Sequence, residues 1–233
     1  MSTIPPASGA TPAAKPVPVS LTLPSPVRYP PPSLPGSFRL ETFTMPRERF
    51  HRVYWKGRDP LDPSVAGMNR YDCTPALPPV QQFGVLYLAM DLETCWLEAV
   101  VRDSVVRPAG DPIEIPAKKM TDRWACEMLL EAEVTVANFS DRSLVDLGET
   151  ASNVMADSYV RTQRWSELLY AHNLSQVDGI RYRSRFKTSE FCIALFNRGI
   201  TKAKLKVQNP RSIDPATSAE IQSVMSRYGV VPT

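Results

Sequence analysis

The stretch that decides the fold is FGVLYLAMDLETCWLEAVVRD, residues 83–103. It opens with a short apolar run, which predicts a buried β-strand over residues 83–89. Asp91 follows, and its side chain can accept hydrogen bonds from the free amides in the first turn of a helix. The sequence therefore predicts a buried strand that leads directly into a helix capped by Asp91.

The helix expected over residues 92–103 has one apolar face, made of Leu92, Cys95, Trp96, Ala99 and Val100. At about 100° per residue, Glu98 lies roughly 60° from Cys95 around the helix axis. Glu98 therefore flanks the buried face, a position from which a carboxylate can be held firmly and still reach a cleft.

Strand-like and helix-like patterns alternate outward from this segment, which indicates a mixed α/β domain. The strands that we expect cover residues 50–55, 83–89, 129–139, 143–147, 179–184 and 191–196, with an edge strand at 203–207. The further helices that we expect cover residues 151–172, with a break near Asp157, and 214–228, which begins at Asp214-Pro215. Residues 56–82 form a long loop, and loops of this length inside a domain are usually functional.

The first 36 residues differ from the rest of the chain. They contain eleven of its 23 prolines, no acidic residue, and only Lys15 and Arg28 as charged residues. Proline removes backbone donors and disfavours helix, so we expect residues 1–36 to be a disordered or polyproline II tail. The catalytic domain is then expected to cover residues 37–233. A proline-rich segment can also dock into an aromatic groove, which stays open as an alternative role for the tail.

The composition excludes several classes of function. A hydrophobic fraction of 43% and a charged fraction of 22% are ordinary for a soluble protein. The net charge of +3 comes from basic residues spread among acidic ones, so direct nucleic-acid binding is not expected. No apolar run approaches the ~20 residues that span a bilayer, and the N-terminus lacks a secretory signal pattern. We therefore expect a cytoplasmic protein.

The cysteines give no sign of a metal site or of a disulfide framework. Cys73, Cys95, Cys126 and Cys192 show no short paired spacing. With only two histidines and no local cluster of histidine and cysteine, we expect buried free thiols and no catalytic metal.

Catalytic motifs of common enzyme classes are absent: there is no nucleophile elbow, no phosphate loop and no dinucleotide-binding glycine motif. What remains is a set of side chains suited to a dinucleotide, namely Arg52, Arg70, Tyr71, Tyr87, Glu98 and Ser184. Arginines bind pyrophosphate through charge-assisted hydrogen bonds, and aromatic rings stack on a base or a nicotinamide. A carboxylate can stabilise the oxocarbenium-like charge that develops when a glycosidic bond breaks.

The order of these features resembles the RES-domain family, which is named after its characteristic Arg, Glu and Ser. The resemblance covers residues 50–196 and rests on a strand with Arg, a loop with Arg-aromatic, the strand Leu-Tyr-Leu-Ala, a helix with Glu, and Asp-Gly-Ile-x-Tyr-x-Ser. The family's loop usually reads Gly-Gly-Arg-aromatic-Asn. Here Met68-Asn69 precede Arg70, and Asp72-Cys73 follow Tyr71.

The resemblance implies a fold similar to ADP-ribosyltransferases, with a split, mostly antiparallel sheet and flanking helices. It also implies a toxin of a bacterial toxin–antitoxin pair that degrades NAD by hydrolysis or phosphorolysis, with a protein antitoxin covering the cleft. NAD is then the substrate, and no cofactor is required.

The resemblance also assigns a role to each residue of the set. Arg52 and Arg70 would hold the phosphates, Tyr87 would pack on the nicotinamide, and Glu98 would stabilise the ribosyl cation. Ser184 would position the ligand by hydrogen bonding, and Tyr71 would contribute from the loop beside Arg70.

Alternatives stay open at the level of sequence. ADP-ribosyl transfer to a protein uses the same bond cleavage with another acceptor, and a non-enzymatic binding module would act through the proline-rich tail. Each site residue also has an ordinary structural interpretation, such as an ion pair for Arg52 or a solvated helix position for Glu98. The alternating basic residues at 181, 183, 185 and 187 could form a solvated face, a phosphate-binding wall or a docking site for an acidic antitoxin.

Overall fold

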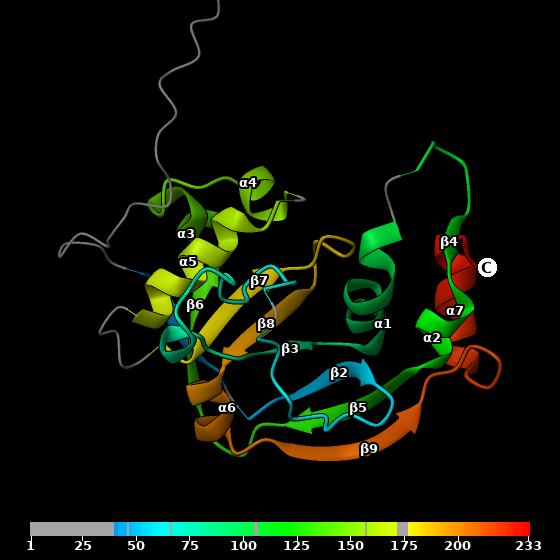
Figure 1. The fold of residues 1–233 in the computed structure, drawn as a ribbon, viewed down its shortest axis with the longest axis horizontal. Helices are drawn as coiled ribbons and strands as arrows, with labels where there is room; N and C mark the ends of the chain where they lie inside the picture. The colour runs from blue at the N-terminus through cyan, green and yellow to red at the C-terminus, as the bar shows by residue number, and fades with distance from the viewer. Residues whose placement is uncertain (1–39, 46, 66, 105–106, 157, 172–176) are drawn as a thin grey trace, which may run out of the picture.

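The structure is a computed structural model that describes residues 40–45, 47–65, 67–104, 107–156, 158–171 and 177–233. The tail expected at residues 1–36 lies outside the described residues. The prediction of a mixed α/β fold with a mostly antiparallel sheet and flanking helices is confirmed (Figure 1).

The main sheet has eight strands in the order β1-β6-β7-β8-β3-β2-β5-β9. Their bounds are β1 Thr42–Met45, β2 Arg49–Trp55, β3 Val85–Ala89, β5 Arg123–Leu129, β6 Val134–Phe139, β7 Gly179–Arg183, β8 Phe191–Phe196 and β9 Lys206–Ser212. All neighbouring strands are antiparallel except β6 and β7. A second, two-stranded parallel sheet pairs β4 (Ile113–Ile115) with β10 (Val230–Pro232).

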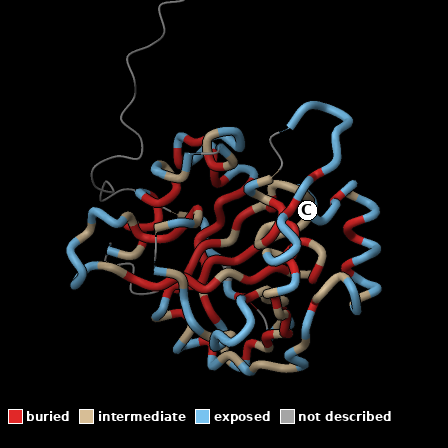
Figure 2. Tube along the Cα trace, turned by 45° about the vertical axis from the view of Figure 1, so that its right-hand side comes forward, coloured by how far each residue is buried: buried red, intermediate tan, exposed pale blue. Residues whose placement is uncertain are grey.

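The helices form two groups on either side of the sheet's middle (Figure 1). One group lies beside β6 and β7 and consists of α3 (Asp141–Asp146), α4 (Ala151–Met155) and α5 (Val160–Ala171). The other lies beyond β2 and β5 and consists of α1 (Leu92–Trp96), α2 (Ala117–Thr121) and α7 (Ala219–Tyr228). Helix α6 (Asn197–Ala203) links β8 to β9. Buried residues concentrate along the central strands (Figure 2).

The segment over residues 83–103 folds as predicted. Strand β3 leads into α1, whose first turn is capped by Asp91: its carboxylate accepts a hydrogen bond of 2.7 Å from the Thr94 amide. The helix continues as a π-helical segment, Leu97–Val101, and a 3₁₀ turn, Arg102–Ser104.

Other boundaries differ from the predictions. The strand expected over residues 143–147 is wrong, because residues 143–146 belong to α3 and Leu147 is its C-cap. Leu144 and Leu147 are both buried in one core, and a spacing of three puts two residues on one helix face but on opposite faces of a strand. The edge strand expected at 203–207 is β9, displaced toward the C-terminus by α6. The expected residues 129–139 divide into the end of β5, a turn and β6.

Two helix predictions also need correction at their ends. The helix expected over residues 151–172 is two helices, α4 and α5, and Asp157, where we placed the break, lies outside the described residues. The last helix begins at Ala219 and not at residue 214, because Ser218 caps it and the Asp214 side chain instead accepts the Ala216 amide in the preceding turn.

The sheet is split between β2 and β3. These strands share a single Cα pair, His51 with Ala89, whereas β2 pairs with β5 along its whole length. The freed edge of β2 is satisfied by the Cys95 thiol of α1, which accepts from the Val53 amide at 3.1 Å and donates to the His51 carbonyl at 3.4 Å. A helix side chain thus takes the place of a neighbouring strand where the ladder is broken.

Candidate active site

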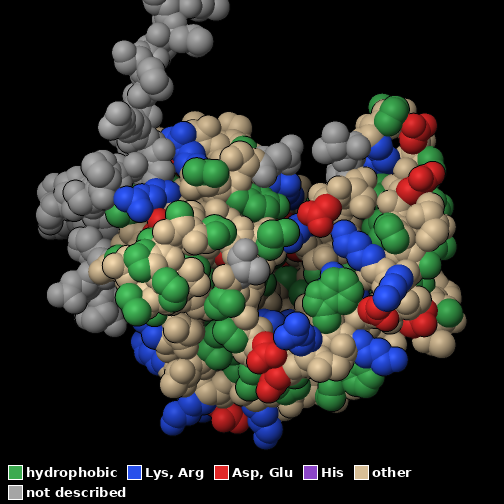
Figure 3. Space-filling view, in the orientation of Figure 1, with side chains coloured by type: hydrophobic (Ala, Val, Ile, Leu, Met, Phe, Trp, Pro, Cys, Tyr) green, Lys and Arg blue, Asp and Glu red, His purple; other side chains and the backbone are tan. Residues whose placement is uncertain are grey.

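A cavity of about 630 Å³ lies at the split between β2 and β3. Its walls come from β2, β3, the π-helical segment after α1, and the long loop that follows β2. Figure 3 shows a hollow near the middle of one face, bordered by basic and hydrophobic side chains. The volume falls within the ~300–1,000 Å³ usual for small-molecule sites.

Glu98 lies on the π-helical segment and lines the cavity. Its Oε1 accepts two hydrogen bonds of 2.8 Å, from the Ser184 hydroxyl and from the Arg185 amide. Among the described residues, its Oε2 has no hydrogen-bond partner. The carboxylate is therefore fixed through one oxygen, and the other stays available.

Ser184 is fully buried at the end of β7, behind Glu98. Its hydroxyl donates to Glu98 and accepts from the amides of Phe186 at 3.2 Å and Lys187 at 3.4 Å. A hydroxyl has one proton and two lone pairs, so these contacts use its whole capacity. The structure thus places Ser184 as a support for Glu98, whereas the sequence led us to expect a ligand contact.

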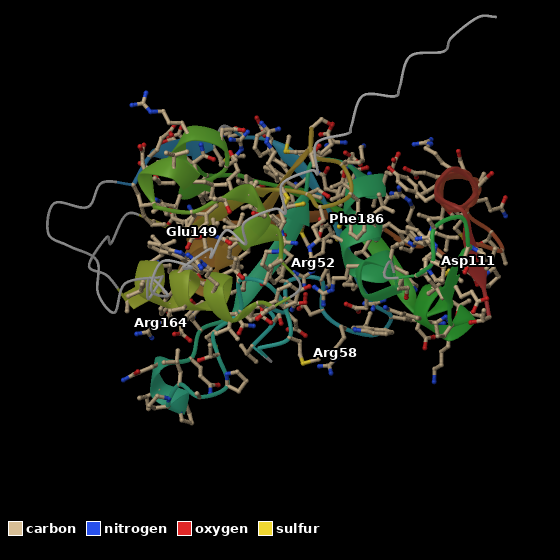
Figure 4. All side chains as sticks on the ribbon, turned by 90° about the horizontal axis from the view of Figure 1, so that it is seen from above. Arg52, Arg58, Asp111, Glu149, Arg164 and Phe186 are labelled. Atoms are coloured by element: carbon tan, nitrogen blue, oxygen red, sulfur yellow. The ribbon has the colours of Figure 1, made fainter. Side chains whose placement is uncertain are left out.

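Arg52 extends from β2 into the cavity. One of its terminal nitrogens, Nη2, donates to the Asp62 carbonyl at 2.5 Å, and its buried Nε has no partner among the described residues. Burial lowers the pKa of Arg52 from its ordinary value. The ion pair that served as the ordinary interpretation is absent from the described part of the chain. Figure 4 shows Arg52 near the middle of the molecule, between the parts that carry Glu149 and Asp111.

Arg70 is 5% exposed and lies against the Tyr182 ring, with its guanidinium carbon 5.5 Å from the ring centroid. Burial alone lowers the pKa of Arg70, but the neighbouring groups Tyr71, Tyr182 and Glu98 raise it above its ordinary value. The site therefore holds a permanent positive charge beside the Glu98 carboxylate.

Tyr87 lines the cavity from β3, and its hydroxyl points into the loop. The hydroxyl donates to Asp72 at 2.9 Å and accepts from the Tyr71 amide at 2.9 Å. Burial, followed by the charge of Asp72, raises the pKa of Tyr87 well above its ordinary value. Tyr87 is thus a neutral donor that joins the loop to the sheet.

Asp72 is fully buried and organises the loop that carries Arg70. Its Oδ2 accepts from the Ser64 hydroxyl at 2.8 Å and from both the amide and the side chain of Asn69 at 2.9 Å. Ser64 in turn pairs with Val85 at the free edge of β3. Positions 69 and 72, where this sequence departs from the family's usual loop, therefore contact each other directly. This pair of departures is the sequence signal from which the role of Asp72 could have been inferred.

Tyr71 lies in the core and does not line the cavity. Its ring packs at 4.7 Å from the Tyr182 ring, and its carbonyl accepts a hydrogen bond of 2.6 Å from Ser166. The structure thus brings Arg52, Arg70, Tyr87 and Glu98 together, with Ser184 and Tyr71 behind them. Cavity residues that the sequence did not nominate include Trp55, Arg102, Tyr159 and Tyr182.

The alternating basic residues after β7 make individual contacts. Arg181 and Arg183 stack on the Phe191 ring at 3.0 and 4.1 Å, and Lys187 pairs with Asp91 at 3.2 Å. Arg185 contributes its backbone amide to Glu98. These residues therefore brace β7, β8 and α1.

No group of metal-ligating side chains occurs in the described ranges. The four cysteines are free and buried, and burial raises the pKa of the Cys95 thiol to about 12. Within the same ranges, no helix is long and apolar enough to cross a membrane.

The class of protein is indicated by three features together: the split sheet, the cavity at the split, and the arrangement of Arg52, Glu98 and Ser184 around it. The RES domain family model matches residues 46–216, and the chain therefore belongs to the RES domain family. Among solved structures, the chain is similar to one in the crystal structure of the M. tuberculosis MbcT–MbcA toxin–antitoxin complex. The TM-score is 0.57 at 14% sequence identity, over 77% of this chain and 90% of that one, so the fold is shared. A search of curated proteins gives no significant match.

Proposed function

We propose that the protein degrades NAD by cleaving the bond between nicotinamide and ribose, with water or phosphate as the acceptor. NAD is the substrate in this proposal, and neither a cofactor nor a metal takes part. Membership of the RES domain family supports this chemistry, and the geometry of the cavity supplies the residues for it.

The observation that carries the proposal is the state of the Glu98 carboxylate. One oxygen is held by the Ser184 hydroxyl and the Arg185 amide, and the other has no partner among the described residues. A carboxylate held in a fixed orientation within the cavity stabilises positive charge that develops on the ribose as nicotinamide leaves. Because its orientation is set before substrate binds, little reorganisation is needed in the transition state.

Two arginines suit the diphosphate of NAD. Arg52 has a buried Nε with no partner among the described residues, and Arg70 stays positively charged within the cavity. Guanidinium groups form charge-assisted, often bidentate hydrogen bonds with phosphate oxygens. The rings of Tyr87, Tyr159 and Tyr182 line the same cavity and can pack on the nicotinamide.

We further propose that the protein is the toxin of a toxin–antitoxin pair, with a protein antitoxin that covers the cavity. The similarity to a chain of the MbcT–MbcA toxin–antitoxin complex supports this part of the proposal. Exposed apolar side chains at the rim of the cavity, Val65 and Met68, are suited to contact a protein partner.

The proposal is tested by incubating the purified protein with NAD and measuring released nicotinamide by chromatography, with and without phosphate. Water gives ADP-ribose, phosphate gives its 1″-phosphate, and transfer to an added protein gives a labelled acceptor. Glu98→Gln should lower the rate of NAD cleavage by about 10²- to 10³-fold. The matched control is Glu114→Gln, which removes an exposed carboxylate of β4 and should leave the rate unchanged. Absence of nicotinamide release under every condition would refute the proposal.

A further inference from the structure

Trp55 is an exposed aromatic side chain in the wall of the same cavity. It ends β2, and 47% of its surface is exposed. The other aromatic residues of the wall are buried or half-buried. A large apolar ring open to solvent inside a cavity is the kind of surface that a flat ligand covers.

The indole of Trp55 is supported on one face by Arg123. The guanidinium carbon lies 3.3 Å from the centroid of the ring, and the two residues face each other in the register of β2 and β5. Arg123 is itself held, because its Nε donates to the Lys119 carbonyl at 3.3 Å. Burial, with a contribution from Arg102, lowers the pKa of Arg123 to about 10, so it is charged at neutral pH.

Arg102 lies on the continuous helical stretch that also carries Glu98. It follows Glu98 by four residues, and both side chains line the cavity. Glu98 is held by Ser184 at the end of β7, whereas Trp55 pairs with Arg123 of β5. In the strand order, β7 and β5 lie on opposite sides of the split between β3 and β2. The cavity thus has a carboxylate end and a tryptophan end.

We propose that Trp55 is the platform on which the adenine of the dinucleotide stacks, on the face of the indole that Arg123 leaves free. This inference rests on the proposed function, since it places the adenylate half of NAD opposite the nicotinamide half. The exposed Arg58, whose amide donates to the Trp55 carbonyl at 3.1 Å, and Arg102 line the same cavity and can contact the phosphate next to the adenosine. Trp55 then determines specificity for dinucleotides over mononucleotides without taking part in bond cleavage.

The competing explanation is that Trp55 belongs to an apolar rim that contacts only a protein partner. Met68 provides the matched control, because it lines the same cavity and is 69% exposed. A protein-docking rim predicts similar behaviour for both side chains. An adenine platform predicts an effect of Trp55 alone, because the indole has an aromatic face that stacks on a purine and the methionine side chain has none.

The binding test uses AMP as the probe and needs no catalysis. AMP should quench the tryptophan fluorescence of the full chain, and Trp55→Ala should weaken AMP binding by about 5- to 150-fold in calorimetry. Trp55→Phe should weaken it less, and Met68→Ala should leave it unchanged. No AMP binding to the unchanged protein, equal affinity in Trp55→Ala, or equal losses in Trp55→Ala and Met68→Ala would each overturn the inference. Circular dichroism checks that each variant is folded. If Trp55→Ala does not fold, the AMP affinity of Trp55→Phe, compared with that of the unchanged protein, tests the adenine platform instead.

The kinetic test compares NAD with nicotinamide mononucleotide, which lacks the adenylate. Trp55→Ala should raise KM for NAD with kcat unchanged and should not alter cleavage of the mononucleotide. An equal loss on both substrates would overturn the inference while leaving the proposed function intact. If the unchanged protein cleaves neither substrate, the proposed function fails, and AMP binding still decides whether Trp55 is an adenine platform.

Discussion

Replacing Asp72 with asparagine tests the link between the loop and the sheet. The carboxylate accepts four hydrogen bonds, one at Oδ1 from Tyr87 and three at Oδ2 from Ser64 and Asn69. Asparagine has nearly the same shape but only one acceptor oxygen. Its least costly orientation keeps that oxygen toward Ser64 and Asn69, which turns the amide group toward the Tyr87 hydroxyl.

The magnitude follows from this arrangement. Charge-assisted hydrogen bonds exceed neutral ones by roughly 1 kcal/mol each, and three such bonds lose their charge. Because neighbouring bonds are not additive, we expect Asp72→Asn to lower the free energy of unfolding by about 2–3 kcal/mol. For a chain of this size that is a fall of about 4–12 °C in Tm. Displacement of Arg70 with the loop should also reduce kcat/KM for NAD by roughly 10- to 100-fold.

The assay is urea denaturation followed by circular dichroism, together with NAD cleavage at saturating and limiting substrate. Asp111→Asn is the control, because it makes the same change of charge at an exposed position far from Arg52 (Figure 4). A double-mutant cycle with Tyr87→Phe should give a coupling energy of about 1 kcal/mol. The reasoning is refuted if Asp72→Asn unfolds at the same urea concentration as the control, or if the two substitutions are additive.

Three further predictions concern the support of the site and the sheet. Ser184→Ala removes one of two donors to Glu98 and should lower kcat for NAD cleavage by roughly 10- to 100-fold; a raised KM with unchanged kcat would instead indicate a ligand contact. Gly179→Ala places a methyl group too close to the Ala194 carbonyl oxygen and should lower the free energy of unfolding by about 1–3 kcal/mol, and an unchanged urea midpoint would contradict this. Burial raises the pKa of Asp91, but the hydrogen bonds of its cap and a lysine lower it more, so its net shift is downward. The stabilising contribution of Asp91 should be complete above the ordinary carboxyl pKa and lost as the pH falls through the folded-state pKa. The difference in free energy of unfolding between the unchanged protein and Asp91→Asn should therefore shrink in acid. A difference that does not depend on pH would contradict this role of Asp91.

Local patterns predicted the elements whose signals are unambiguous. The apolar run at residues 83–89 and the Asp91 cap led to β3 and α1, because burial and capping are both readable from neighbouring residues. The run at 143–147 misled because a short apolar segment fits a strand and a helix equally well. Strand β5 was largely missed, since its Arg123 and Glu127 make it less apolar than a typical buried strand.

The site was predictable as a set of residues but not as a set of contacts. Glu98 and Ser184 are 86 residues apart, and only the folded chain shows that one hydroxyl and one amide hold the same carboxylate oxygen. Trp55 ended a predicted strand without any local signal of its exposure. Exposure depends on β3 leaving β2 after a single pair, and no local pattern encodes that divergence.

The Cys95 thiol limits which residues can occupy its position. A side chain there must give a proton to the His51 carbonyl and receive one from the Val53 amide, while most of its surface faces apolar neighbours. Among small residues, serine shares both abilities, whereas alanine and valine have neither and would leave two main-chain groups without partners inside the protein. The residue types that position 95 accepts are therefore limited by hydrogen bonds to the chain's own backbone and not by substrate. A residue that lines the cavity can thus be invariant for reasons unrelated to catalysis.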